Sequence, residues 1–191
     1  MCVRIYSCGQ RVKRTCLHVH LTVQRRSRME INVKITVLCV GKIKEKFYTQ
    51  AVDEYSKRLS RYCKLDIVEL PDEKTPDNAG EQTNIAIKSK EGERILSNIR
   101  QDDYVIALAI EGKMLDSVEV SQHIERLGIE GKSSIVFVIG GSLGLSKEVL
   151  DRADYKLSFS KMTFPHQLMR VILLEQIYRA YRIMKNEPYH K

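Results

Sequence analysis

The stretch Leu157-Ser158-Phe159-Ser160-Lys161-Met162-Thr163-Phe164-Pro165-His166-Gln167-Leu168-Met169-Arg170 decides how the last strand of the chain meets its last helix. An apolar, strand-like run passes through small polar residues directly into a helical pattern, which we expect to span about 165–185. Pro165 suits the first turn of a helix, and Thr163 or Ser160 can cap the free amides nearby. Because His166 and Arg170 are four residues apart, they share one face of that helix.

The two halves of this helix differ in pattern. The second half has one polar and one apolar side, and His166 and Arg170 lie in line with the apolar side. In the first half, Leu168, Val171 and Ile172 occupy the side that later becomes polar, so this half is apolar all round. One sheet cannot cover such a helix, and we expect a homodimer. The histidine is either a satisfied core residue or part of a functional site.

The rest of the chain alternates between strand and helix patterns. Strands are expected at about 33–40, 64–70, 104–110, 134–139 and 155–160, and helices at about 44–62, 84–99, 117–127, 146–152 and 165–185. Several strands are continuous apolar runs, which are typical of strands buried on both faces. The sequence therefore predicts an α/β fold with a mainly parallel sheet covered by helices on both faces. It contains no transmembrane span, and no membrane partner is expected.

The positive charge of the chain is concentrated at its start. The formal net charge is +8, but residues 1–32 hold seven of the 32 basic residues and one of the 24 acidic residues. We expect residues 1–32 to be a basic extension and residues 33–191 to form a single domain. The extension has the Arg-rich character of a transit peptide but no apolar core of signal-peptide length. We favour upstream sequence read through from a misplaced start, with Met29 as an alternative initiator.

The cysteines and histidines of the extension do not have the spacing of a zinc site. They lack the paired C-x2–4-C and H-x3–5-H arrangement, so no metal is expected. These residues are Cys2, Cys8, Cys16, His18 and His20. The remaining cysteines, Cys39 and Cys63, suit small hydrophobic residues in a reducing compartment, which indicates the cytoplasm.

Three loops at the carboxyl ends of expected strands could hold a ligand, since ligands of parallel sheets bind there. They follow Leu108, Ile139 and Phe159. The second contains G-G-x-x-G at 140–144, which allows close backbone approach but is also compatible with a simple tight turn. It matches neither the Walker loop, nor the dinucleotide-binding G-x-G-x-x-G, nor the nucleophile elbow G-x-S-x-G.

Four motifs together resemble one known family. They are I-G-G-S-L-G-L at 139–145, S-F-S-K-M-T-F-P-H-Q-L-M-R at 158–170, E-Q-I-Y-R-A at 175–180 and P-Y-H-K at 188–191. The chain from about residue 33 to 191 resembles the pseudouridine N3-methyltransferases of the bacterial large ribosomal subunit, which belong to the SPOUT superfamily. The resemblance implies a C-terminal trefoil knot, a homodimer and S-adenosylmethionine as methyl donor. It also implies a pseudouridine of 23S rRNA, within the large subunit or the assembled 70S ribosome, as the acceptor.

The resemblance also assigns site residues. Those expected to bind the donor are Leu108, Gly140, Phe159, Ser160, Lys161, Met162, Thr163 and Phe164. Those expected at the acceptor are His166, Arg170, Tyr189 and His190, with Lys191 as a further RNA contact. The acceptor N3 must lose a proton, and His166 or His190 could take it, or a nearby basic group could favour the anionic base. We expect the chain end to be held only by a partner, with the tail reaching towards the partner's pocket.

Two alternatives stay open from the sequence. One is a non-catalytic module that binds RNA or ribosomes and keeps the fold, and the other is a SPOUT methyltransferase that acts on tRNA. The nearly balanced charge of residues 33–191 indicates that a folded RNA–protein surface supplies much of the recognition.

Overall fold

A computed structural model describes residues 33–76 and 78–189 of the chain. The strands are β1 (Lys34–Val40), β2 (Lys64–Leu70), β3 (Tyr104–Met114), β4 (Ser134–Ile139) and β5 (Tyr155–Ser158). The helices are α1 (Lys46–Leu59), α2 (Glu81–Ser97), α3 (Ser117–Ile129), α4 (Lys147–Arg152) and α5 (His166–Met184). Every expected element is present, with bounds that differ by a few residues. The extension at 1–32, with its cysteines and histidines, lies outside the described residues.

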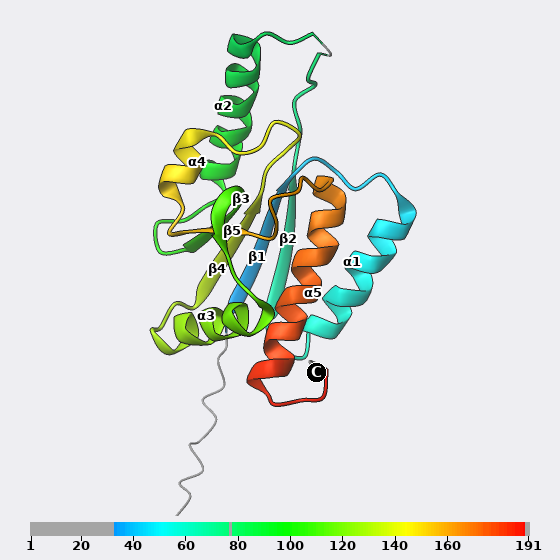
Figure 1. Cartoon of the computed structure of the whole chain (residues 1–191), viewed down its shortest axis with the longest axis vertical. Helices are drawn as coiled ribbons and strands as arrows, with labels where there is room; N and C mark the ends of the chain where they lie inside the picture. Colours follow the sequence, from blue (N-terminus) through cyan, green and yellow to red (C-terminus); the bar gives the residue numbers. More distant parts are fainter. Residues whose placement is uncertain (1–32, 77, 190–191) are drawn as a thin grey trace, which may run out of the picture. The chain divides into compact units, whose positions relative to one another are not determined.

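The five strands form one parallel sheet in the order β2-β1-β4-β3-β5 (Figure 1). Parallel strands need crossover connections, and the alternation with helices provides them. All carboxyl ends therefore meet at one edge of the sheet, which confirms the arrangement that the sequence predicts.

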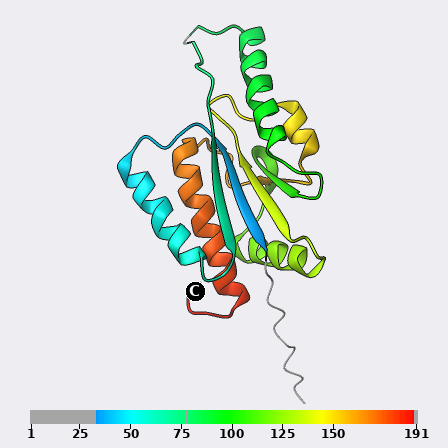
Figure 2. The same cartoon turned by 180° about the vertical axis from the view of Figure 1, so that it is seen from behind.

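Helices cover both faces of the sheet. On one face α1, α3 and α5 bury alternate residues of β1, among them Ile35 and Val37, against residues of α5 such as Leu173 and Ile177. On the other face Leu38 and Val40 of β1 pack with Ile95 of α2 and Val149 of α4 (Figure 2). The two cores use opposite sides of the same strand, as the period of two in a strand requires.

The third strand is longer than expected and bends around the end of β5. Leu157 of β5 pairs in parallel with Leu108 and also with Lys113, so it lies between the two halves of β3. The connection between these halves passes close to β5 at Gly112, where a Cβ would lie 2.8 Å from the Lys156 carbonyl carbon. Only glycine fits this crossing. The trefoil knot itself stays a prediction.

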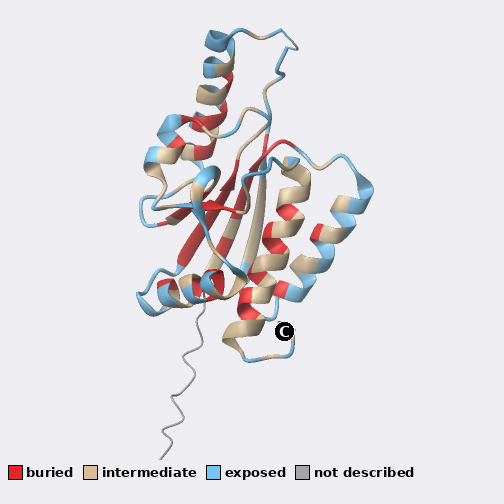
Figure 3. Ribbon diagram, in the orientation of Figure 1, coloured by how far each residue is buried: buried red, intermediate tan, exposed pale blue. Residues whose placement is uncertain are grey.

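The last helix begins later than expected and has a different cap. Pro165 is its N-cap residue and no side chain caps it, so the expectation that Thr163 or Ser160 caps the helix is wrong. Figure 3 shows its buried side facing the sheet, where Leu173 and Leu174 have no more than 1% of their surface exposed. Leu168, Val171 and Ile172 are only half-buried within one chain.

Candidate functional site

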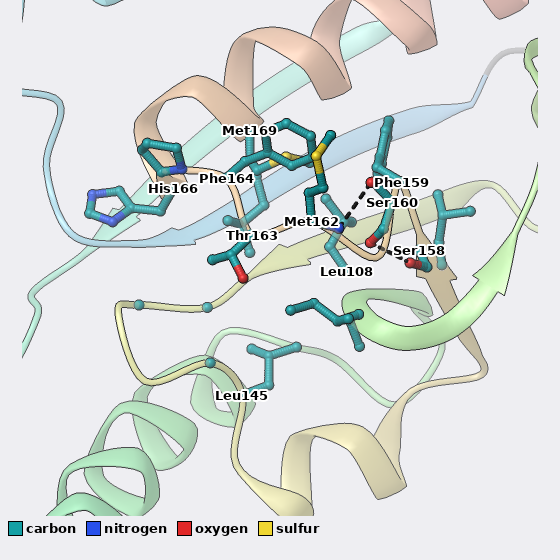
Figure 4. A pocket seen from close by; sticks show the side chains of 18 of the residues that line it. Leu108, Leu145, Ser158, Phe159, Ser160, Met162, Thr163, Phe164, His166 and Met169 are labelled. Atoms are coloured by element: carbon teal, nitrogen blue, oxygen red, sulfur yellow. Dashed lines mark hydrogen bonds between the residues drawn. The ribbon is translucent and has the colours of Figure 1, made fainter.

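A cavity of about 510 Å³ opens at the carboxyl edge of the sheet. Three connections enclose it: the bend of β3, the loop after β4, and the connection between β5 and α5 (Figure 4). The residues from these connections include Leu108, Ala109, Ile110, Ile139, Gly140, Gly141, Ser142, Gly144, Leu145, Phe159, Ser160, Met162, Thr163 and Phe164. The three loops that the sequence singled out thus meet around one space.

The loop after β4 is a tight hairpin. The Gly144 amide donates a hydrogen bond of 3.1 Å to the Gly141 carbonyl, and Gly144 has a φ of +82°, where glycine is favoured. A Cβ at Gly140 would lie 2.9 Å from the Gly144 carbonyl carbon, so the loop's own path requires glycine there. Its short side chains leave backbone groups open to the cavity. Leu145 then supplies an apolar wall, across the cavity from Met162 and Thr163 (Figure 4).

Two serine hydroxyls hold the connection between β5 and α5 in shape. The Ser158 hydroxyl donates to the Ser160 carbonyl at 3.2 Å, and the Met162 amide donates to the Ser160 hydroxyl at 3.0 Å (Figure 4). Local bonds of this kind suit serine in turns. They leave Phe159 and Phe164 lining the cavity and Met162 with 66% of its surface exposed at its rim.

His166 lines the cavity at the start of α5. Its ring packs on the turn after β1, where a Cβ at Gly41 would lie 3.2 Å from His166 Nε2. Burial lowers the pKa of His166 most, and the positive charge of Arg170 lowers it further; Asp72 partly opposes this, and Lys44 adds the smallest lowering effect. The imidazole is therefore neutral at neutral pH and can accept a proton.

Arg170 lies outside the cavity lining and has 1% of its surface exposed. Its guanidinium pairs with Glu69 at 2.5 Å and donates to the carbonyls of Val40, at 3.2 Å, and Gly41, at 2.5 Å. The fixed fork of donors in arginine suits such a set of acceptors. Arg170 thus joins α5 to the ends of β1 and β2 and has no free surface for RNA. We assign it a positioning role in place of the RNA contact that we expected.

Tyr189 is packed against its own chain, in contrast to the unsupported tail that we expected. Its ring lies edge-on to Tyr178 at 5.0 Å and under the Arg179 guanidinium at 4.8 Å. Its hydroxyl donates to Glu175 Oε1 at 3.2 Å. His190 and Lys191 lie outside the described residues, so their expected roles stay predictions.

Seven of the eight residues expected to bind the donor line the cavity, and Lys161 is exposed outside its lining. Sequence reasoning missed Ile110, Ser142, Leu145 and Met169 as lining residues. Ile110 is the last residue of the strand expected at 104–110, and Ser142 and Leu145 each follow a glycine, so these positions were the available signal. Met169 lies one turn into α5 from Pro165, and nothing in its apolar character separates it from the core.

Other common reaction centres are not formed by the described parts of the chain. Burial raises the pKa of Cys63 to about 11 and that of Cys39 to about 12, so both thiols stay protonated. Over residues 33–76 and 78–189, no three His, Cys, Asp or Glu side chains are placed to hold a metal ion. No helix in these ranges is long and apolar enough to cross a membrane.

The comparison with protein families decides the classification. A family model described as "Predicted SPOUT methyltransferase" matches residues 33–190. The chain belongs to this SPOUT methyltransferase family. It is an enzyme, and its α/β fold is the one that the sequence predicts.

Curated relatives match over their whole length. A protein of Clostridium novyi named "Ribosomal RNA large subunit methyltransferase H" is 68% identical over 159 residues, which are 83% of this chain and 100% of the relative. A Clostridium tetani protein of the same name is 63% identical over the same shares of both chains. Among solved structures, a probable methylase family protein from Haemophilus influenzae has a TM-score of 0.45 and 17% identity, covering 85% of this chain and 72% of its own.

Methyltransferases of this family take their methyl group from S-adenosylmethionine, and the cavity fits such a ligand. Its volume of about 510 Å³ lies in the ordinary range for small-molecule sites. Apolar side chains, among them Leu108, Leu145 and Phe159, can enclose an adenine ring. The glycine hairpin presents backbone groups that can hold the polar parts of the ligand.

Proposed function

We propose that the chain transfers a methyl group from S-adenosylmethionine to N3 of a pseudouridine in 23S rRNA, on the large subunit or the assembled ribosome. The observation that carries this proposal is the cavity at the carboxyl edge, lined by seven of the residues that the resemblance assigns to the donor. Relatives of 63% and 68% identity that are named ribosomal RNA large subunit methyltransferases support the choice of rRNA.

The donor supplies an activated methyl group on a positively charged sulfur. The protein then has to align the acceptor nitrogen with that methyl group and exclude water, and alignment alone can lower the barrier substantially. The glycine hairpin and the serine-braced connection are rigid walls suited to this task. The acceptor base enters at the open side of the cavity, beside His166.

A proton must leave N3 when the methyl group arrives. The new N–C bond replaces the N–H bond, the sulfonium becomes a neutral thioether, and the proton passes to a base. We propose His166 as this base, because it lines the cavity and its lowered pKa keeps it neutral. His190 is the second candidate from the sequence.

We also propose that the enzyme acts as a homodimer in the cytoplasm. Ile110 and Met162 at the rim of the cavity are 53% and 66% exposed, and the first half of α5 is only half-buried. A second copy packed on this side would cover both features and complete the site. The cytoplasm contains the ribosomes that the proposed reaction needs, and its reducing conditions suit the free thiols of Cys39 and Cys63.

The proposed reaction is tested with S-adenosylmethionine that carries a tritiated methyl group. The acceptors are 70S ribosomes and free large subunits from a bacterium lacking this modification, and unmodified tRNA as the alternative. We expect label in the ribosomal fractions, recovered as N3-methylpseudouridine after digestion of 23S rRNA. Label in tRNA alone would favour a tRNA methyltransferase, and absence of both donor binding and transfer would favour a non-catalytic module.

A further inference from the structure

The connection between β1 and α1 carries an unusual set of exposed side chains. Lys42, Lys44 and Lys46 alternate along it with Ile43 and the exposed Glu45, which leaves an excess of positive charge, and Phe47 and Tyr48 follow in the first turn of α1. We call residues 42–48 the basic loop. All three lysines are exposed, and Phe47 has 59% of its surface in solvent. Figure 3 shows the start of α1 largely in the colour of exposed residues.

The backbone of the basic loop is anchored although its side chains are free. The Ile43 amide donates to Glu69 Oε1 at 3.1 Å, and the Lys44 amide donates to Gln167 Oε1 at 2.9 Å. The buried Arg170 holds the same Glu69 and the carbonyl of Gly41. Two backbone amides of the loop are thus held by side chains of β2 and α5, and one of these side chains is itself paired with the buried Arg170, which fixes the loop in position as a binding surface requires.

The basic loop lies beside the candidate active site. Gly41, directly before it, packs on the His166 ring, and Gln167, which holds Lys44, is the next residue of α5. Figure 4 shows His166 lying beside the chain that leaves β1. Whatever binds the loop is therefore next to the acceptor position.

The lysine charges have no acidic partner in the parts of the chain that the structure describes. None of the ion pairs over those residues includes Lys42, Lys44 or Lys46. Phe47 contacts Tyr48, with ring centroids 4.2 Å apart, and leaves much of its ring uncovered. Unpaired cations beside an exposed aromatic ring are the combination that binds the phosphates and unstacked bases of RNA.

We propose that the basic loop is an RNA-docking surface that holds the strand flanking the target nucleotide. Lys42, Lys44 and Lys46 bind phosphates, and Phe47 stacks on a neighbouring unpaired base. This inference rests on the proposed function and specifies how its substrate is held. RNA fits better than an acidic protein segment, because the surface borders a site that acts on a nucleotide and offers both cations and a stacking face.

The experiment compares two triple variants of the full chain with equal loss of charge. The test variant is Lys42→Gln, Lys44→Gln, Lys46→Gln. The control is Lys57→Gln, Lys64→Gln, Lys132→Gln, whose exposed side chains lie near the opposite edge of the sheet, at the end of α1, at the start of β2 and before β4. Co-sedimentation measures affinity for unmodified 70S ribosomes at several salt concentrations, and calorimetry measures affinity for S-adenosylmethionine.

We expect the test variant to bind ribosomes at least about tenfold more weakly, while the control stays within about twofold of wild type. Each lost phosphate contact should also reduce the slope of log affinity against log salt by about 0.7 to 0.9. Phe47→Ala alone should weaken binding by about tenfold without changing the salt slope. Donor affinity and the dimer content by light scattering should be unchanged in every variant.

Equal ribosome affinity of wild type and test variant would overturn the proposal, as would an equal loss in the control. A test variant that also loses donor affinity would show that the loop acts through the cavity and not through RNA. Phe47→Ala protein that becomes monomeric would assign Phe47 to a subunit interface instead. Wild-type protein that binds ribosomes through this loop but transfers no methyl group would contradict the proposed function and leave the docking surface standing.

Discussion

Replacing Arg170 by methionine separates a positioning role from an RNA contact. Methionine nearly matches the length of the arginine stem but removes the charge and every hydrogen-bond donor. Glu69 would lose its ion pair, and the carbonyls of Val40 and Gly41 would lose their donor from α5. The helix that carries His166 would no longer be tied to the ends of β1 and β2.

The expected loss of stability is large. Removing one partner of a fully buried ion pair costs about 3–5 kcal/mol, but the Glu69 side chain is 34% exposed and can be rehydrated. We therefore expect a loss of about 2–3 kcal/mol, in which the two carbonyls do not add in full because they are part of the same network. A domain of this kind has a total stability of about 5–15 kcal/mol, so the variant should fold but be clearly weakened. Arg58→Met is the matched control, because Arg58 forms an exposed pair with Glu54 four residues away. An exposed pair of this kind contributes little to stability, so we expect a much smaller loss than for Arg170→Met.

Urea unfolding followed by circular dichroism, at one protein concentration because a dimer is expected, measures both losses. Glu69→Gln removes the charge of the ion pair but keeps an amide oxygen that can still accept a hydrogen bond from the Ile43 amide. We expect it to lower the free energy of unfolding by about 1–3 kcal/mol. The positioning role would be refuted if Arg170→Met cost less than about 1 kcal/mol while ribosome binding disappeared. That result would support Arg170 as an RNA contact.

Three further outcomes are expected. His166→Gln should lower the methylation rate by about 10²–10⁴-fold, and the acid limb of the wild-type pH–rate profile should lie below the ordinary histidine pKa. A variant with the full wild-type rate would show that another group is the base. Ile172→Glu places a charge on the half-buried side of α5 and should shift the protein to monomers in light scattering. A variant that stays dimeric would show that the dimer interface does not include this side of α5. Burial raises the pKa of Glu91, so the ionised carboxylate destabilises the folded state as pH rises. In urea unfolding, Glu91→Gln should therefore be more stable than wild type at pH 7, and the difference should vanish near pH 4. Equal stability of the two proteins at pH 7 would contradict this prediction.

The sheet and its helices could be predicted because several strands are apolar runs and because strand and helix patterns alternate along the chain. The register of these patterns also placed the three cavity loops at one edge, as parallel topology requires. The bend of β3 could not be predicted in the same way. Residues 111–113 are Glu-Gly-Lys and resemble a turn, and the pairing of Lys113 and Met114 with β5 depends on a crossing that only the three-dimensional path reveals.

The candidate site was predictable where residues follow strand ends and not where they act through tertiary contacts. Arg170 was correctly placed in line with the buried stripe of α5, but an arginine near a site is usually assumed to bind a ligand. Its actual partner, Glu69, lies 101 positions away in sequence and belongs to the edge strand β2. Likewise, Tyr189 was expected to be loose because chain ends usually are. It instead packs back on Tyr178, 11 positions earlier, after the chain reverses beyond α5, and the helical pattern does not encode this reversal.

Calorimetry of S-adenosylmethionine with two neighbouring tryptophan variants tests most directly whether this cavity holds the methyl donor. Thr163 lines the cavity and Lys161 does not, although both are exposed and belong to the same connection. Thr163→Trp should fill the cavity and weaken donor binding by at least about a hundredfold, roughly 2.7 kcal/mol, while Lys161→Trp binds as wild type does. Donor affinity in Thr163→Trp equal to that of the wild-type chain would contradict the assignment of the donor to this cavity.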